Sequence, residues 1–369
     1  KTLINPNGRI ELVPVGLAYV WDDHTNNDLW SSSNWTDIGS PNGAGDSAVF
    51  DNTDANLDGS TISLGRNTTI GSISFESDQG QAFTLSGGTI TLDSGDVNTP
   101  ALIRVMSNTA PTIASQILLQ SNLNISEVDA LSVLNLTGTI SGPFVGITKS
   151  GFGTLGLMSA DSNYTNGTTI EGGLLQVGAS SSLDQYGRVL KGPAGLGVLT
   201  LASGTSIEAT GGNQTLHNSV VFNGNVGVMG ANTLTLQGSQ GGEGKIASAT
   251  TLNVADAAGA LTFGSDLLLT GTENLTKTGS GTVNFNSTAT NFSGNVLVNQ
   301  GSVGIGTNNG FGQGSVSLAN GTTLVANTNG LAVDSNISLA AGTESINSGA
   351  HNLTLTGDIT GAGTLNKTG

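Results

Sequence analysis

The 369-residue sequence predicts an all-β protein that coils as a solenoid, and three observations lead to this class. Short runs of Val, Ile, Leu and Thr are separated by turns of Gly, Asn, Ser and Asp, a pattern typical of short strands. Glycine occurs 56 times, and the chain is 36% hydrophobic but only 10% charged, which argues against disorder. The chain also repeats itself, as stacked repeat proteins do.

Four sequence blocks recur in the same order. The phrase around Lys149 returns 128 residues later around Lys277, and it begins a third time at Lys367. The other matched pairs are 163–178 with 291–306, 197–207 with 314–324, and 232–238 with 351–357. These offsets predict two tandem repeat units, at 134–267 and 268–369.

Within each block the apolar residues alternate with Thr or Ser, as in "TITLDSG" at 89–95, so one face of each strand is apolar. Strands that return every 8 to 12 residues fit a sandwich, a barrel or a solenoid. Stacking repeats, low charge and frequent corner glycines favour the solenoid. Coils of roughly 20 to 25 residues predict about 15 to 18 coils. One helix candidate remains, at 182–191.

The N-terminal third has its own composition. Residues 1–17 contain two short apolar runs, and 61–133 follow the strand pattern of the later repeats. Between them, 18–60 hold all three tryptophans, Trp21, Trp30 and Trp35. Because tryptophan buries a large area and a solenoid end exposes apolar rungs, we expect this segment to form a cap or a lateral contact.

The two ends of the chain predict an assembly contact. The phrase that begins at Lys367 stops at its turn and leaves an incomplete coil, whose open edge invites strand addition. We expect residues 1–13 of one subunit to continue the coil begun at 351–369 of the next, which would make a head-to-tail filament. The alternative is that both ends are trimming sites in a longer chain. The interface residues expected are Leu3, Ile4, Ile10, Leu12, Val13, Leu353, Leu355, Ile359, Leu365 and Gly369.

These phrases resemble the autotransporter-associated β-strand repeat of exported bacterial proteins. The resemblance rests on "LTKTGSGTVNF" at 275–285, on "NFSGNVLVNQGSVGIG" at 291–306, and on the opening "LWSSSNWTDIGSPNGAGDSAVF". It implies a right-handed parallel β-helix at the cell surface or outside the cell. The sequence departs from the family in lacking a C-terminal membrane barrel and a sorting helix.

The charge and composition of the chain limit the classes of partner that we expect. A formal charge of −16 with only ten Lys and Arg would repel nucleic acid. The absence of cysteine fits an exported bacterial protein that is stabilised without disulfides. The sequence contains no run of 18 apolar residues, so it predicts no membrane-spanning helix. The chain begins at Lys1 without a signal peptide, which we interpret as a mature or trimmed product. The expected partners are further copies of the chain and a surface or matrix polysaccharide.

No catalytic constellation emerges from the sequence. His24, His217 and His351 each stand alone in polar stretches, no G-x-S-x-G motif occurs, and the acidic residues are scattered through turns. A lysine repeated at every copy of one turn indicates a structural role. We therefore predict no catalytic residues and no cofactor, with a polysaccharide lyase or hydrolase as the enzymatic alternative.

One stretch resembles half of a calcium loop. Asp54, Asn56 and Asp58 have the D-x-N-x-D-G spacing, but Gly65 stands where such a loop needs a bidentate Glu. We favour a polar turn here over a calcium site. The function predicted from the sequence is an extracellular structural solenoid, with a surface-binding adhesin as the first alternative and the enzyme as the second.

Overall fold

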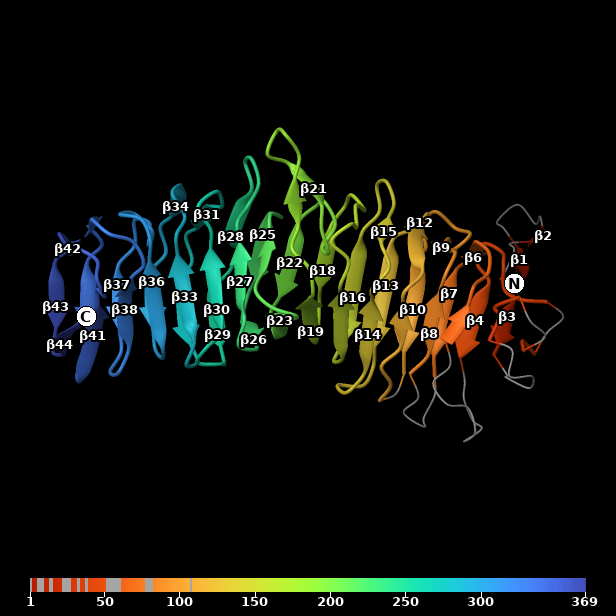
Figure 1. The fold of residues 1–369 in the computed structure, drawn as a ribbon, viewed down its shortest axis with the longest axis horizontal. Coiled ribbons are helices and arrows are strands. Elements are labelled where there is room, and N and C mark those ends of the chain that lie inside the picture. Colours follow the sequence, from red (N-terminus) through yellow and green to blue (C-terminus); the bar gives the residue numbers. More distant parts are fainter. Residues whose placement is uncertain are drawn as a thin grey trace. The chain divides into compact units, whose positions relative to one another are not determined.

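A computed structural model describes residues 16–21, 28–31, 34–36, 39–50, 61–76, 82–106 and 108–369, together with the backbone of 2–4 and 10–12. These residues form strands and turns without any helix, so none of the described segments is a helix able to cross a membrane. The strands stack in parallel as a β-solenoid of about 14 turns, which confirms the predicted parallel β-helix (Figure 1). The chain divides into two compact units, Lys1–Gly167 and Thr168–Gly369.

The described residues of the first unit form three parallel stacks of strands and one hairpin. The hairpin pairs β1 (Thr2–Ile4) with β2 (Ile10–Leu12) in antiparallel register. One stack consists of β3 (Ala18–Val20), β4 (Ser47–Phe50), β7 (Ser72–Phe75), β10 (Ala101–Val105), β13 (Leu123–Glu127) and β16 (Ile147–Gly151). The second consists of β5 (Thr61–Ser63), β8 (Thr84–Ser86), β11 (Thr112–Ile113), β14 (Val133–Leu136) and β17 (Thr154–Leu157). The third consists of β6 (Thr68–Ile70), β9 (Thr89–Leu92), β12 (Gln116–Leu119) and β15 (Ile140–Ser141).

The second unit repeats this plan. Its first stack is β18 (Thr168–Ile170), β22 (Leu199–Ala202), β25 (Val220–Asn223), β28 (Glu243–Ile246), β31 (Leu268–Gly271) and β34 (Thr290–Phe292). Its second is β19 (Leu174–Val177), β23 (Thr205–Ala209), β26 (Val226–Met229), β29 (Thr250–Val254), β32 (Leu275–Thr278), β35 (Val296–Val298), β37 (Val316–Leu318), β40 (Ile337–Leu339) and β43 (Ile359–Gly361).

The third stack of the second unit is β24 (Gln214–Leu216), β27 (Thr233–Leu236), β30 (Ala260–Phe263), β33 (Thr282–Phe285), β36 (Ser302–Ile305), β38 (Thr323–Ala326), β41 (Thr343–Asn347) and β44 (Thr364–Thr368). Two short pairs complete the unit. They are the parallel pair β39 (Leu331–Val333) and β42 (Leu353–Leu355), and the antiparallel hairpin β20 (Ser182–Leu183) and β21 (Val189–Lys191).

The interior of each unit follows from the alternation in sequence. In β13, Leu123 and Ile125 are buried while Asn124 is exposed. Register carries each inward residue onto another apolar residue one coil away, as when Ile103 pairs with Ile125. Successive coils therefore share one continuous apolar core, which a single coil could not form alone.

Asparagines at the corners tie each coil to the next. Asn67 Oδ1 accepts a bond of 3.0 Å from the backbone N–H of Thr89, one coil further on. The same contact joins Asn225 to Thr251, also at 3.0 Å. Asn122, Asn213, Asn274, Asn295, Asn308, Asn320, Asn329 and Asn336 make it as well. The abundance of Asn in the turns is thus explained by the stacking of coils.

The sequence repeats are not whole numbers of coils. Paired strands lie 20 residues apart at Val296 and Val316 and 24 apart at Leu123 and Ile147. Because the coils differ in length, a matched block and its copy about 120 residues later lie on different stacks. The matched blocks 197–207 and 314–324 illustrate this shift, because the first contributes β22 to one stack of the second unit and the second contributes β37 to another. The division after Gly167 falls inside the predicted repeat unit 134–267.

Candidate functional site

The repeated Lys-Thr/Ser-Gly turn places a lysine at a corner of the solenoid. Lys149 on β16 and Lys277 on β32 are buried, with 0% and 1% of their surface exposed. Lys277 Nζ donates at 2.8 Å to the carbonyls of the next two residues and at 3.1 Å to that of Gln300, one coil further on. Lys367 on β44 bonds the next two carbonyls in the same way, but its side chain is exposed. Each lysine thus braces the carbonyls of its own turn.

Lys149 has an additional partner. Its Nζ lies 2.6 Å from Oε2 of Glu127, and both side chains are fully buried. Burial raises the pKa of Glu127 to about 7, and the positive charge of Lys149 opposes that rise. The sequence contains no signal for this pair, because Glu127 lies on β13, in the coil before Lys149.

The two glycines of the turn are required by its geometry. Gly151 and Gly279 have φ of +81° and +76°, in the left-handed region that favours glycine. At Gly153 and Gly281 a Cβ atom would collide with backbone atoms of the preceding coil. The motif Lys-x-Gly-x-Gly therefore marks a corner of the solenoid. The motif recurs because the same kind of corner recurs along the chain.

Removing the buried ammonium of Lys277 should change how stability depends on pH. Burial lowers the pKa of Lys277 to about 8, so between pH 8 and its unfolded value the unfolded chain holds a proton that the folded chain has released. The contribution of Lys277 to stability therefore grows as pH rises through this window and is lost as pH falls through about 8. We expect the midpoint of urea unfolding to rise less between pH 7.5 and 10 in Lys277→Met than in the wild type.

The control for this measurement is Lys367→Met, which removes the exposed lysine of the same motif. Because it retains Lys277, it should keep the pH slope of the wild type. Equal slopes for Lys277→Met and the wild type would show that the buried ammonium does not titrate in this range.

No three His, Cys, Asp or Glu side chains of the described part gather into a metal site. Nδ1 of the half-buried His217 lies 2.7 Å from the carbonyl oxygen of Gly238, and His351 lies in the bend before β42. His24 and the calcium candidates Asp54, Asn56 and Asp58 lie outside the described residues.

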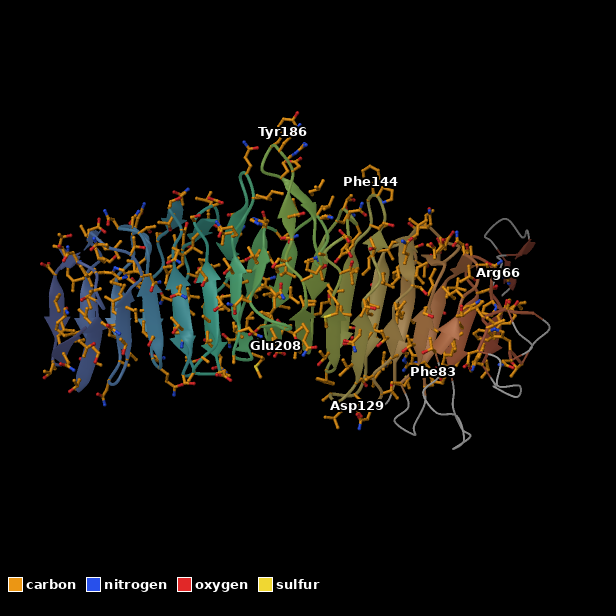
Figure 2. All side chains as sticks on the ribbon, in the orientation of Figure 1. Arg66, Phe83, Asp129, Phe144, Tyr186 and Glu208 are labelled. Carbon is orange, nitrogen blue, oxygen red and sulfur yellow. The ribbon has the colours of Figure 1, made fainter. Side chains whose placement is uncertain are left out.

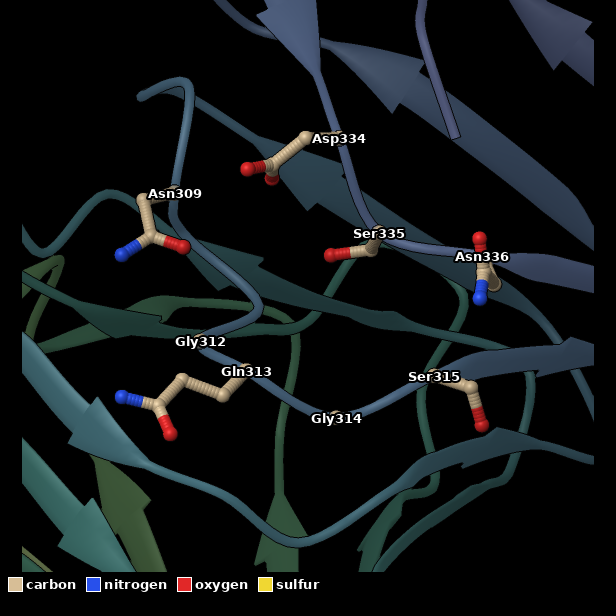
Figure 3. Close-up of a pocket in the computed structure, with 8 residues that line it drawn as sticks. All are labelled: Asn309, Gly312, Gln313, Gly314, Ser315, Asp334, Ser335 and Asn336. Carbon is tan, nitrogen blue, oxygen red and sulfur yellow. The ribbon is translucent and has the colours of Figure 1, made fainter. Parts of the chain in front are cut away.

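A polar groove lies on the second unit. It has a volume of about 340 Å³ and lies between segments 309–315 and 334–336 (Figure 3). Figure 3 shows the side chains of Asn309, Asp334 and Ser335 around this space. Asp334 is its single carboxylate, whereas glycoside hydrolysis uses a pair of them. This groove therefore lacks the acid and base that such a reaction needs.

The predicted cap residues lie inside the first unit. Trp21, Trp30 and Trp35 are 1%, 0% and 4% exposed. The ring centroid of Trp35 is 5.0 Å from Trp21, 4.9 Å from Trp30 and 5.7 Å from Phe50. The backbone N–H of Trp21 bonds the carbonyl of Val49 at 2.8 Å, and β3 pairs in parallel with β4. The tryptophan-bearing segment thus adds a first, irregular coil whose aromatic rings fill its interior.

The residues predicted for assembly divide into two groups. Leu353 and Leu355 on β42 are half-buried, while Ile359, Leu365 and Gly369 are exposed. They belong to the coil formed by β42, β43 and β44, and we call Leu353, Leu355, Ile359 and Leu365 the open coil face. Of the N-terminal group, Leu3, Ile4, Ile10 and Leu12 are described by backbone alone, and Val13 lies outside the described residues.

Two features escaped the sequence analysis. Glu344 is fully buried on β41, and no described donor reaches its carboxylate oxygens. The segment 182–191, the one helix candidate of the sequence, is a β-hairpin, because Gly187 takes a φ of +74° and the Asp184 side chain bonds the N–H groups of Tyr186 and Arg188. The spacing of Asp and Gly in "DQYG" was the available signal of a turn.

Comparison with protein-family models, with curated proteins and with solved structures finds no match to this chain.

Proposed function

We propose that this chain is a structural protein that acts outside a bacterial cell, a β-solenoid whose copies stack head to tail into a filament, sheath or surface coat. The open coil face is the observation that carries this proposal. Ile359 is 44% exposed, whereas Val316 and Ile337, on the same ladder in the two preceding coils, are 0% and 2% exposed. A further coil added to β43 would cover Ile359 in the same way as the described coils cover Val316 and Ile337.

The proposed filler of this face is residues 1–13 of another copy. In the structure β1 and β2 pair with each other, with Leu3 opposite Glu11. To continue a parallel coil they would exchange this pairing for pairing with β43 or β44. Such a contact joins two different surfaces and does not close, so it propagates as a filament.

The extracellular location rests on composition and on the resemblance to autotransporter-associated repeats. The absence of cysteine fits an exported protein that is stabilised without disulfides. The charge of −16 would repel the phosphates of nucleic acid. A structural role, without catalysis or a cofactor, fits side chains that hold one coil against the next, such as the corner asparagines and the buried lysines.

Placing a charge on the open coil face should abolish stacking. We expect the wild type to form oligomers whose size grows with concentration, and Leu365→Lys to remain monomeric, because an ammonium cannot be buried beneath an added coil without a partner. Deleting residues 1–13 should have the same effect. Sedimentation velocity and electron microscopy measure both.

Leu131→Lys is the matched control, since Leu131 is 66% exposed on a turn of the first unit, and it should assemble as the wild type does. A wild type that stays monomeric at every concentration would contradict the proposal, as would a Leu365→Lys variant that still forms filaments. Filaments from the chain lacking 1–13 would keep the stacking but exclude this segment as the filler.

The adhesin remains the second candidate, and the hairpin β20–β21 is the observation that favours it. This hairpin interrupts the regular coils of the second unit and carries an exposed aromatic ring, Tyr186, at 62% exposure.

A further inference from the structure

The hairpin β20–β21 projects from the second unit where a regular coil would carry a strand of the third stack. Just before it, Ser181 N–H bonds the carbonyl of Thr215 on β24 at 2.9 Å, so the chain follows the stack as far as this point. It then departs, turns at 184–188 and returns along β21. Figure 2 shows Tyr186 at the outer tip of the hairpin.

Hydrogen bonds to Asp184 shape the tip of the hairpin. The carboxylate of Asp184 accepts bonds from the backbone N–H groups of Tyr186 at 2.8 Å and Arg188 at 3.0 Å, and from Arg188 Nε at 2.9 Å. These bonds hold the pKa of Asp184 below its usual value. The guanidinium carbon of Arg188 lies 5.2 Å from the centre of the Tyr186 ring. Asp184 therefore pairs with Arg188, and the arginine lies beside a ring that stays 62% exposed.

The tip is also fixed against the neighbouring coils. The N–H of Gln240, in the turn between β27 and β28, donates to the carbonyl of Gly187 at 2.7 Å. Between the hairpin and the turns lies a groove of about 460 Å³, within the range of about 300–1,000 Å³ usual for small-molecule sites. We call it the hairpin groove, and the lining residues that matter for its chemistry are Tyr186, Ser239, Gln240, Ser265, Asp266 and Thr288.

Three successive turns form the floor of the hairpin groove. They connect β27 to β28, β30 to β31, and β33 to β34, and they contribute hydroxyl groups, one amide and the carboxylate of Asp266. Oδ2 of Asp266 accepts a bond from Gln237 Nε2 at 3.0 Å, which orients the carboxylate. Adjacent coils of a parallel stack are spaced by about 4.8 Å, close to the length of one pyranose unit. A sugar polymer laid along the turns would therefore meet one hydroxyl-bearing turn per unit, at Ser239, Ser265 and Thr288.

The chemistry of the lining selects among ligands. An aromatic ring beside hydroxyl and carboxylate groups matches a pyranose, which has an apolar C–H face and a rim of hydroxyls. An anionic polymer is disfavoured, because Asp266 is the charged group of the lining and the nearby cation of Arg188 is already paired with Asp184. We infer that the hairpin groove binds a neutral polysaccharide, with Tyr186 as the stacking platform and Asp266 as a hydroxyl acceptor.

Affinity electrophoresis tests this inference without relying on filament formation. The chain carrying Leu365→Lys serves as the background, so that a failure of stacking and a failure of binding are separate results. Gels contain hydroxyethyl cellulose, galactomannan or, as an anionic comparison, polygalacturonate. We expect at least one neutral polymer to retard the protein, Tyr186→Ala to weaken that binding by at least about tenfold, and Asp266→Asn to weaken it less.

Two variants test whether the aromatic ring of Tyr186 itself, rather than a general change in the protein, accounts for the binding of the sugar. Tyr186→Phe keeps the ring and should bind as the parent chain does, while Phe152→Ala removes a 76% exposed ring that does not line the groove and should leave binding unchanged. Absence of retardation by both neutral polymers would overturn the inference. Stronger retardation by polygalacturonate, or equal binding by Tyr186→Ala, would overturn it too.

Discussion

Lys149→Met is expected to lower the local free energy of unfolding around β13 and β16 by about 3–5 kcal/mol, the usual effect of removing one partner of a buried ion pair. The reason is that Glu127, fully buried 2.6 Å from Lys149 Nζ, would lose its cation. Repeat proteins open segment by segment, so hydrogen exchange of peptides covering 123–151 measures the effect better than a global transition.

The loss should depend on pH in a defined direction. The pKa of Glu127 is raised to about 7 in the folded chain, so its favourable contribution is present below its unfolded value and is lost as pH rises through about 7. Without Lys149 the carboxyl group holds its proton still more tightly. Lys149→Met should therefore lose more stability relative to the wild type at pH 8 than at pH 5.

Two comparisons make this prediction specific. The double variant Glu127→Gln/Lys149→Met buries no charge and should recover most of the loss. Lys367→Met removes the lysine of the same motif from an exposed position and should change stability by no more than about 0.5 kcal/mol. If Lys149→Met and Lys367→Met behave alike, the buried pair does not stabilise the first unit.

The fold was predictable because the sequence patterns that specify its strands and turns are local and recur along the chain. Alternation such as that of Leu123, Asn124 and Ile125 places each strand and chooses its buried face. Corner glycines such as Gly151 and Gly279 mark the turns, and their recurrence predicts stacking. The number of coils was overestimated, at about 15 to 18 against about 14, partly because the first coil is long: Ala18 pairs with Ser47, 29 residues on.

The candidate sites were less predictable because they depend on contacts between coils of unequal length. Glu127 and Lys149 are 22 residues apart and meet only because β13 and β16 pair with Ile125 opposite Lys149. The hairpin groove likewise joins a turn at 184–188 to turns near 240, 266 and 288. No periodicity in the sequence predicts that these residues from different coils will lie in contact. The hairpin was the one helix candidate in the sequence, and its turn is set by one side chain, Asp184.

Trp30→Ala is expected to open the first coil of the solenoid. Trp30 is fully buried, its ring centroid lies 4.9 Å from Trp35 and 6.1 Å from Phe50, and its Nε1 donates to the carbonyl of Pro41 at 3.0 Å. Truncating such a side chain costs about 3–5 kcal/mol, because a cavity replaces the ring. The backbone of Trp30 also bonds Ser63 on β5, so the loss should extend to the pairing of this coil with its neighbour.

Tryptophan fluorescence measures this effect selectively, because the chain has three tryptophans and all of them belong to this cluster. In Trp30→Ala the emission of Trp21 and Trp35 should shift to the red, and exchange should quicken in 18–50 while that of the second unit stays unchanged. Trp30→Phe, which keeps an aromatic ring, should lose less stability, and Phe152→Ala, on an exposed turn of the same unit, should lose none. Unshifted emission together with unchanged exchange would mean that the cluster does not hold the first coil in place.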